Sequence, residues 1–403
     1  MRLILLFVGV VLGISACTFE VDMQTPGSET PLPVLPSNTD TPQPDEPTPS
    51  PYPDTPSPPE ISAPAIEAPA LVKIDFLNEL DGWGVTETEV ARTNDGGLTW
   101  YDVTPRDITE TTGSLRFFFL DRDHAWVQKP DFANFPNSGF LSRTSNGGLT
   151  WRTFDTPFSS GDLSFLDENN GWMLADLGVG AGSNAVAVYQ TTNGGASWNL
   201  KYVNDPNHPE AGDSLPLGGL KSGITPIDMQ TAWVGGVVYS PGTLYLYRTD
   251  DGGNTWSPVN MELPPGAENF ELSIDPDEMQ FVTSDDGFLA VHMAGNSTQT
   301  AIYITRDAGN IWTLTPTLIP NDGSFDFLSA EEAVIYNGEQ FYSTRDAART
   351  WNIIPPDIPF GESLRSMDFA NVLSGWVLTL DAANQHFLYR TTDGGTTWFP
   401  ILP

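Results

Sequence analysis

An eight-residue motif, Thr-x-Asp/Asn-x-Gly/Ala-x-x-Trp, recurs seven times between residues 93 and 398. Successive motif tryptophans are separated by 39 to 58 residues, and they are Trp100, Trp151, Trp198, Trp256, Trp312, Trp351 and Trp398. A period near 50 residues is the length of one four-stranded blade of a β-propeller. The repeat therefore predicts an all-β fold over residues 71–403, a seven-bladed β-propeller of four-stranded antiparallel blades.

A second pattern runs in phase with the motif. The five remaining tryptophans fall once each in five of the seven units, and six units carry a phenylalanine seven residues before that position. In the first unit these residues are Phe76 and Trp83. Each unit is therefore expected to contain a strand ending on Phe, a tight turn and a strand with Trp. A variable loop, a third strand leading into the motif and a fourth strand opening on the motif Trp follow.

The residue types in the motif indicate a structural role. Asp or Asn accepts hydrogen bonds from backbone N–H groups two or three residues on and so closes a turn, while Gly supplies a positive φ. The Trp buries a large area between neighbouring sheets. We therefore interpret the seven motifs as scaffold. Their acidic and amide residues are Asp95, Asn146, Asn193, Asp251, Asp307, Asp346 and Asp393.

The motif resembles the Asp-box, or BNR repeat, of sialidases, sortilin-like receptors, xyloglucanases and photosystem II assembly factors. Residues 71–403 most resemble the photosystem II assembly factor family, through a Phe-x-Asp strand, the stretch Asp81-Gly82-Trp83-Gly84-Val85 and the motif from Thr391 to Trp398. The resemblance implies a propeller whose boxes lie on peripheral hairpins, away from any active centre. It also implies two roles, an assembly factor for a membrane complex or a glycoside hydrolase.

The first 17 residues have the pattern of a bacterial lipoprotein signal. Arg2 precedes an apolar run from Leu3 to Ile14, which is shorter than the roughly 20 residues needed to span a bilayer. The following Ile-Ser-Ala-Cys resembles a lipobox. Residues 1–16 are therefore expected to be a signal peptide, with Cys17, the sole cysteine, lipidated. The alternative is a plain secretory signal with an incidental cysteine. The predicted location is extracytoplasmic, at the cell surface or facing the periplasm.

Residues 17–70 are dense in Pro, Thr, Ser, Asp and Glu. Such a segment buries too little apolar surface to offset the entropy of ordering it. We expect a disordered acidic tether with polyproline character between the lipid anchor and the propeller.

The charge and the chemistry-bearing residues exclude several function classes. The formal net charge is −35, from 52 acidic and 17 basic residues, and such a surface repels nucleic acid. No catalytic motif is present. The segment 275–278 lacks the spacing of a calcium loop and is interpreted as a solvated turn. The histidines occur singly, without zinc-ligand spacing, at His124, His208, His292 and His386. No metal or cofactor is expected, and an enzyme is not favoured.

The strand order predicts which face binds a partner. In an up-and-down blade, the loops between strands two and three share one face with the connections between blades. These segments vary in length here, whereas the turns on the opposite face are short and uniform, and functional loops concentrate where a scaffold tolerates variation. The candidate binding residues on the variable face are Phe132, Phe135, His208, Glu210, Asp213, Tyr239, Glu262 and Glu268. The alternative is an ordinary acidic loop surface.

Three hypotheses of function remain. The first is a non-catalytic, lipid-anchored propeller that binds a protein or glycan partner as a monomer. The second is the assembly factor, and the third is a sialidase- or xyloglucanase-like hydrolase. We further predict that the ring closes by packing of blades one and seven, and not by strand pairing of residues 61–70 with the last blade.

Overall fold

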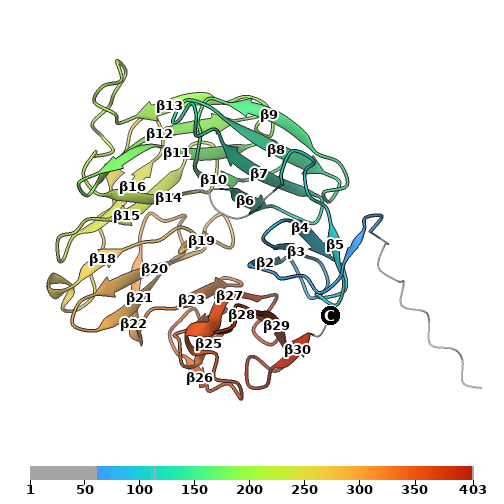
Figure 1. Cartoon of the computed structure of the whole chain (residues 1–403). Helices are drawn as coiled ribbons and strands as arrows, with labels where there is room; N and C mark the ends of the chain where they lie inside the picture. Colours follow the sequence, from blue (N-terminus) through green and yellow to red (C-terminus); the bar gives the residue numbers. More distant parts are fainter. Residues whose placement is uncertain (1–60, 110, 112–114, 402–403) are drawn as a thin grey trace, which may run out of the picture. The chain divides into compact units, whose positions relative to one another are not determined.

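A computed structural model describes residues 61–109, 111 and 115–401. The predicted signal peptide, Cys17 and the tether up to residue 60 lie outside these residues. Seven four-stranded antiparallel blades follow one another around a ring (Figure 1), which confirms the predicted all-β propeller. The part of the chain that the structure describes contains no helix long and apolar enough to cross a membrane. Two short 3-10 helices, η1 (Ala267–Asn269) and η2 (Gly361–Ser363), lie in connections between blades.

The strands of blades one to three run in order from the centre of the ring to its rim. Blade one contains β2 (Lys73–Phe76), β3 (Gly82–Val85), β4 (Val90–Thr93) and β5 (Trp100–Asp102). Blade two contains β6 (Arg116–Phe119), β7 (His124–Pro130), β8 (Gly139–Ser145) and β9 (Arg152–Thr156). Blade three contains β10 (Gly161–Phe165), β11 (Gly171–Gly180), β12 (Ser183–Thr191) and β13 (Asn199–Val203).

Blades four to seven repeat this order. Blade four contains β14 (Leu220–Pro226), β15 (Ala232–Val237), β16 (Leu244–Thr249) and β17 (Ser257–Pro258). Blade five contains β19 (Met279–Phe281), β20 (Gly287–Ala294), β21 (Thr298–Thr305) and β22 (Thr313–Pro320). Blade six contains β23 (Ser324–Phe327), β24 (Ala333–Tyr336), β25 (Phe341–Thr344) and β26 (Asn352–Ile354). Blade seven contains β27 (Leu364–Phe369), β28 (Gly375–Leu380), β29 (His386–Thr391) and β30 (Phe399–Ile401).

One feature of the sheets is not predicted by the sequence repeat. The connection between blades four and five forms a short strand, β18 (Glu271–Ser273), which pairs with β15 on one side and β20 on the other. Blades four and five therefore share one nine-stranded sheet.

The second sequence pattern marks the interfaces between blades. At five interfaces the first-strand Phe stacks on the second-strand aromatic ring of the preceding blade, with ring centroids 3.7–5.1 Å apart. The five second-strand tryptophans are at most 1% exposed, and four of them donate their indole N–H to a backbone carbonyl of the next blade. Five interfaces thus bury two large aromatic rings, and four of the five tryptophans have their buried indole donor satisfied.

The seven motif turns share one hydrogen-bond pattern. In every turn the Thr hydroxyl accepts the N–H of the Gly or Ala four residues on, at 2.9–3.0 Å. The Asp or Asn Oδ1 likewise accepts the N–H four residues on, at 2.9–3.0 Å. This reach is longer than the two or three residues predicted, because two consecutive residues with positive φ, such as Gly147 and Gly148, widen the turn.

Residues 61–70 join the propeller, although the sequence analysis assigned them to the tether. The strand β1 (Ala65–Ile66) pairs with β5 on the outer edge of blade one, and Ile61 is only 8% exposed. The boundary at residue 70 was therefore wrong, because a Pro-rich composition does not reveal that a two-residue strand can pair with a free sheet edge.

The ring closes by packing, as predicted. Blades one and seven lie side by side (Figure 1), and among the described residues no strand of one pairs with the other. Phe76 stacks on Trp376 with ring centroids 3.7 Å apart, and Trp376 donates its indole N–H to Gly96 O at 3.0 Å. The backbone N–H of Phe76 also donates to Asp368 Oδ2 at 2.7 Å. Glu79 Oε1 accepts two more hydrogen bonds across this interface, from Asn371 Nδ2 and Ser374 Oγ, both at 3.0 Å, and apolar side chains of both blades pack around the two rings.

Candidate functional site

A cavity of about 1020 Å³ occupies the centre of the ring and is lined by residues from all seven blades. We call it the channel. Its wall consists mainly of the first strands, and neighbouring residues of a strand face opposite ways. The terminal Phe of each first strand therefore packs into the blade interface, whereas the residue before it, such as Asp75 or Asp368, lines the channel.

Two cationic side chains lie at the end of the channel where the connections between blades enter the first strands. Lys73 opens β2 and Arg116 opens β6, and both line the channel and are exposed. Neither forms an ion pair among the described residues, and Arg116 donates only to the adjacent carbonyl of Leu115. The rings of Phe117 and Phe118 line the cavity beside Arg116. We call this region the channel mouth; it belongs to the variable face.

A third cation of the channel lining, Lys221, has its hydrogen bonds satisfied within the fold. Its Nζ donates to Leu217 O at 2.7 Å and to the carbonyls of Asn184 and Gly219, both at 3.1 Å. Burial lowers the pKa of Lys221 to about 8. The carbonyl contacts hold the connection between blades three and four, so Lys221 is structural.

Three aspartates that line the channel each accept a hydrogen bond from the backbone of the next blade. Asp162 Oδ2 accepts the backbone N–H of Ile224 at 2.8 Å, Asp326 Oδ2 that of Phe369 at 2.5 Å, and Asp368 Oδ2 that of Phe76. These side chains keep a partly accessible surface toward the channel, yet the blades around them exclude most of the water. Desolvation by burial therefore raises the pKa of Asp162 and Asp326 to about 7, and that of Asp368 well above its usual range.

These pKa shifts predict how stability depends on pH. A carboxyl whose folded-state pKa lies above its unfolded value stabilises the fold fully below the unfolded value, near 4, and loses that contribution as pH rises through about 7. Asp162→Asn keeps an oxygen for the Ile224 N–H and cannot ionise. We therefore expect urea unfolding between pH 4 and 8 to show a smaller loss of stability in this variant than in the wild type. An equal loss in both would contradict the structural role of Asp162.

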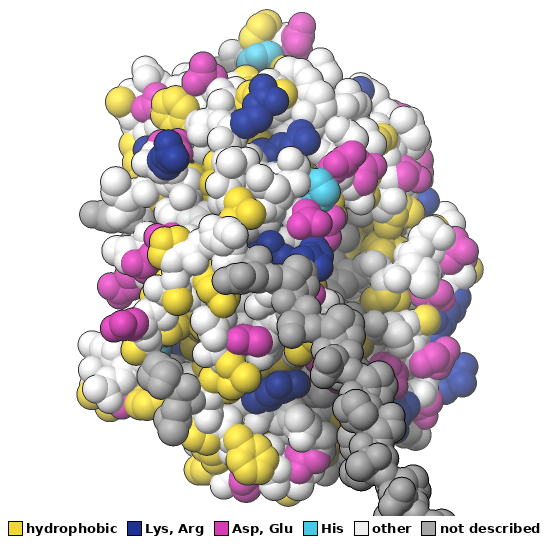
Figure 2. Space-filling view, turned by 90° about the vertical axis from the view of Figure 1, so that its right-hand side faces the viewer, with side chains coloured by type: hydrophobic (Ala, Val, Ile, Leu, Met, Phe, Trp, Pro, Cys, Tyr) yellow, Lys and Arg dark blue, Asp and Glu magenta, His cyan; other side chains and the backbone are white. Residues whose placement is uncertain are grey.

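Acidic and basic side chains are interspersed on the surface, although the protein as a whole is acidic. Acidic side chains are scattered over the side of the molecule in Figure 2, with basic side chains and small apolar groups between them. Most arginines of the motif turns have acidic neighbours; Arg306, for example, pairs with Asp286 and Glu331 at 2.8 and 3.0 Å. Lys73 and Arg116 have no ion-pair partner among the described residues, and the same holds for Arg143, Arg349 and Arg390 of the motif turns.

The eight candidate binding residues lie on the variable-face connections, but none of them lines the channel. Phe132 and Tyr239 are the most exposed aromatic side chains among them, at 67% and 61%. The sequence analysis did not select Lys73 or Arg116. Both stand three residues before the Phe that ends the first strand, so an alignment of the seven units at that position would have revealed them.

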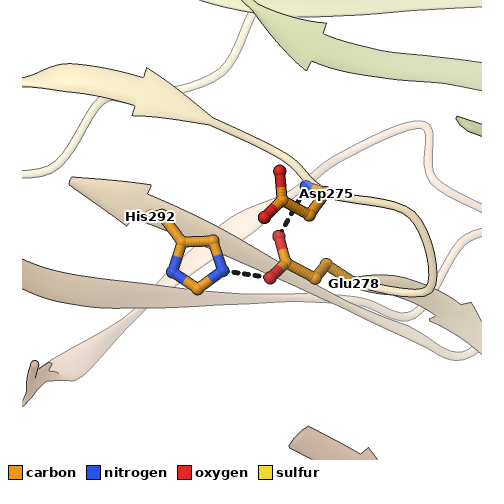
Figure 3. Close-up of side chains that lie close together, drawn as sticks. All are labelled: Asp275, Glu278 and His292. Atoms are coloured by element: carbon orange, nitrogen blue, oxygen red, sulfur yellow. Dashed lines mark hydrogen bonds and ion pairs between the residues drawn. The ribbon is translucent and has the colours of Figure 1, made fainter. Parts of the chain in front are cut away.

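Blade five assembles a second group of charged side chains on the variable face (Figure 3). His292 lies on β20, Glu278 directly precedes β19, and Asp275 lies three residues before Glu278. His292 Nε2 bonds Glu278 Oε1, and His292 Nδ1 lies 2.6 Å from Asp322 Oδ1. Burial lowers the pKa of His292, but the hydrogen bonds and charges of Asp322 and Glu278 outweigh it and raise the pKa to about 10.

The interpretation of residues 275–278 as a solvated turn was wrong for Glu278, which is 8% exposed. Ala290 donates its backbone N–H to Glu278 O at 2.9 Å, which places Glu278 beside β20 and within reach of His292, two residues further on. Pairing of β19 with β20 therefore joins residues that are 14 positions apart in the chain.

Comparisons with known proteins show the fold and leave the family open. No protein-family model matches the chain. A xyloglucanase from Paenibacillus sp. is 25% identical over 191 residues, which cover 42% of this chain and 18% of the xyloglucanase. The chain thus matches less than a fifth of that enzyme's length.

Two solved structures have the same fold. YCF48 bound to a D1 peptide has a TM-score of 0.50 and 16% identity, over 82% of this chain and 95% of YCF48. The GH74 xyloglucanase from Xanthomonas campestris has a TM-score of 0.54 and 14% identity, over 84% of this chain and 55% of the enzyme. At these identities the likeness shows a β-propeller. It supports, at the level of the fold, the resemblance to assembly factors and xyloglucanases.

Proposed function

We propose that this protein is a non-catalytic binding propeller, held outside the cytoplasm by a lipid on Cys17, that captures a carboxylate-bearing segment of a partner protein at its channel mouth. The observation that carries the proposal is the pair Lys73 and Arg116. These two cations have no ion-pair partner among the described residues and line a cavity of about 1020 Å³ in a strongly acidic protein. Ammonium and guanidinium groups bind carboxylates through charge-assisted hydrogen bonds.

Three of the four channel aspartates with a raised pKa favour binding over catalysis; burial raises the pKa of the fourth, Asp75, to about 6, and it accepts no hydrogen bond from the described residues. Asp162, Asp326 and Asp368 each accept a backbone N–H from the neighbouring blade, so their carboxylates have a structural task. A general acid or nucleophile must instead be free to reach the substrate. The solved structure of YCF48 with a D1 peptide, which is similar over most of both chains, supports a peptide as the ligand class. An assembly role at a membrane complex would be one form of this function.

A glycoside hydrolase is the second candidate. It is favoured by the raised pKa of the channel carboxyls, as a general acid requires, and by the similarity to xyloglucanases. Such chemistry also needs two free carboxyl groups about 5–10 Å apart across the sugar. The backbone hydrogen bonds of Asp162, Asp326 and Asp368 weigh against that assignment.

One screen separates these functions. We expect the full chain to select peptides with acidic residues or a free C-terminal carboxylate from a displayed peptide library. A glycan array should give no signal, and a panel of xyloglucan and sialoside substrates should not be hydrolysed. Turnover of any substrate that is lost in Asp162→Asn or Asp326→Asn would replace the binding function with the hydrolase. Glycan binding without turnover would replace the protein partner with a glycan.

A further inference from the structure

A group of charged residues on blade five is explained neither by the propeller scaffold nor by the channel mouth. We call Asp275, Glu278 and His292, together with Asp322, the blade-five cluster. Within the described residues, Asp275, Glu278 and His292 form the one group of three or more potential ligand side chains whose atoms all lie within 4.8 Å of one another. His292 and Glu278 are 5% and 8% exposed, whereas Asp275 is exposed and leaves a path from solvent.

The orientation of His292 matches that of a metal-ligating histidine. Its Nδ1 lies 2.6 Å from Asp322 Oδ1, so that carboxylate fixes the proton on Nδ1 and the rotation of the ring. Its Nε2 consequently faces Glu278 and Asp275 (Figure 3). Histidines that ligate metals hold the other ring nitrogen to a carboxylate or carbonyl in the same way, which fixes the tautomer and raises the basicity of the ligand.

The cluster is rich in groups that bind cations. Three carboxyl groups surround one imidazole; Glu278 and His292 are buried, whereas Asp275 is exposed and the Asp322 side chain is 59% exposed. Imidazole nitrogen and carboxylate oxygens are donors that Zn²⁺ and other divalent transition metals accept, and a site with three protein ligands leaves a fourth position open.

We propose that the blade-five cluster binds a divalent transition-metal ion, best matched by Zn²⁺, through His292 Nε2, Glu278 and Asp275, with Asp322 holding the histidine. The site lies beside the channel, because Pro276 and Asp277 of the same turn line the cavity. Asp275 is the exposed member of the three ligands, so a water or a partner's carboxylate would reach a bound ion from its side. This inference is independent of the function proposed for Lys73 and Arg116.

The test is calorimetric titration of Zn²⁺ into the full chain, purified with chelator and then freed of it. We expect one ion per chain. Asp275→Asn removes an exposed ligand with little risk to folding and should weaken binding at least tenfold. Asp322→Asn should weaken it by about 10–100-fold, the usual effect of losing the partner of a ligating histidine.

His124 provides a matched control on the opposite face. It also lies between two carboxylates, with Nδ1 2.9 Å from Asp121 Oδ2 and Nε2 3.1 Å from Glu168 Oε2, but both carboxylates are about half exposed. His124→Ala should leave the Zn²⁺ isotherm unchanged, whereas His292→Ala should abolish the single-site phase. Equal isotherms for the wild type, Asp275→Asn and Asp322→Asn would overturn the proposal and leave the cluster as a structural ion triad.

Discussion

Replacing Trp376 with alanine is expected to lower the free energy of unfolding by about 3–5 kcal/mol, the usual cost of removing a buried Trp or Phe side chain. Trp376 is fully buried, stacks on Phe76 of blade one and donates its indole N–H to Gly96 O. No strand crosses from blade seven to blade one among the described residues, so this interface depends on side-chain packing around Trp376 and a few hydrogen bonds. Urea denaturation of the full chain measures the effect.

The control for this prediction is Phe399→Ala in the same blade. Phe399 is 63% exposed on the outermost strand, so its removal should change stability by no more than about 0.5 kcal/mol. If Trp376→Ala costs as little as Phe399→Ala, closure does not depend on aromatic packing. The other contacts between blades one and seven would then hold the ring.

The second large effect is expected on affinity. A ligand carboxylate held by Lys73 and Arg116 forms charge-assisted hydrogen bonds, each contributing about 1.5–3 kcal/mol. Lys73→Ala combined with Arg116→Ala should therefore weaken binding of a peptide selected by the screen at least about 100-fold. The residual binding should also depend less on salt concentration, because the screened charge pairs are gone. Fluorescence anisotropy at two ionic strengths measures both changes.

The scaffold could be predicted from the sequence because each repeated residue interacts either within its own turn or with the adjacent blade. The motif Thr and Asp close their own turn, and a Phe such as Phe76 stacks on a Trp such as Trp376 at four of the seven interfaces. A pattern repeated seven times identifies such positions without any knowledge of the three-dimensional arrangement.

The candidate sites could not be predicted in this way, because they depend on departures from the repeat. Lys73 and Arg116 occupy a position where other blades carry different residues, and only ring closure brings that position to a common channel. The pairing of His292 with Glu278 and Asp322 likewise requires strand register and the connection between blades five and six. Single histidines 14 or more residues from their partners show no recognisable spacing.

The channel aspartates could be mistaken for catalytic residues. A raised carboxyl pKa in a cavity is typical of active sites, but structural networks also perturb pKa values. Asp162, Asp326 and Asp368 each bond the backbone of the next blade, which explains their burial without any substrate. Their hydrogen-bond partners, rather than their pKa values, therefore support the binding function over the hydrolase.

The central claim is that the partner binds to the variable face, whereas the motif face is structural. One comparison of affinities tests this claim most directly. The selected peptide would be titrated into two variants that each lose two positive charges. One is Lys73→Ala with Arg116→Ala at the channel mouth, and the other is Arg122→Ala with Arg345→Ala in exposed turns of the motif face. We predict a loss of at least about 100-fold in the first and less than twofold in the second. An equal loss in both, or a larger loss in the second, would contradict the account.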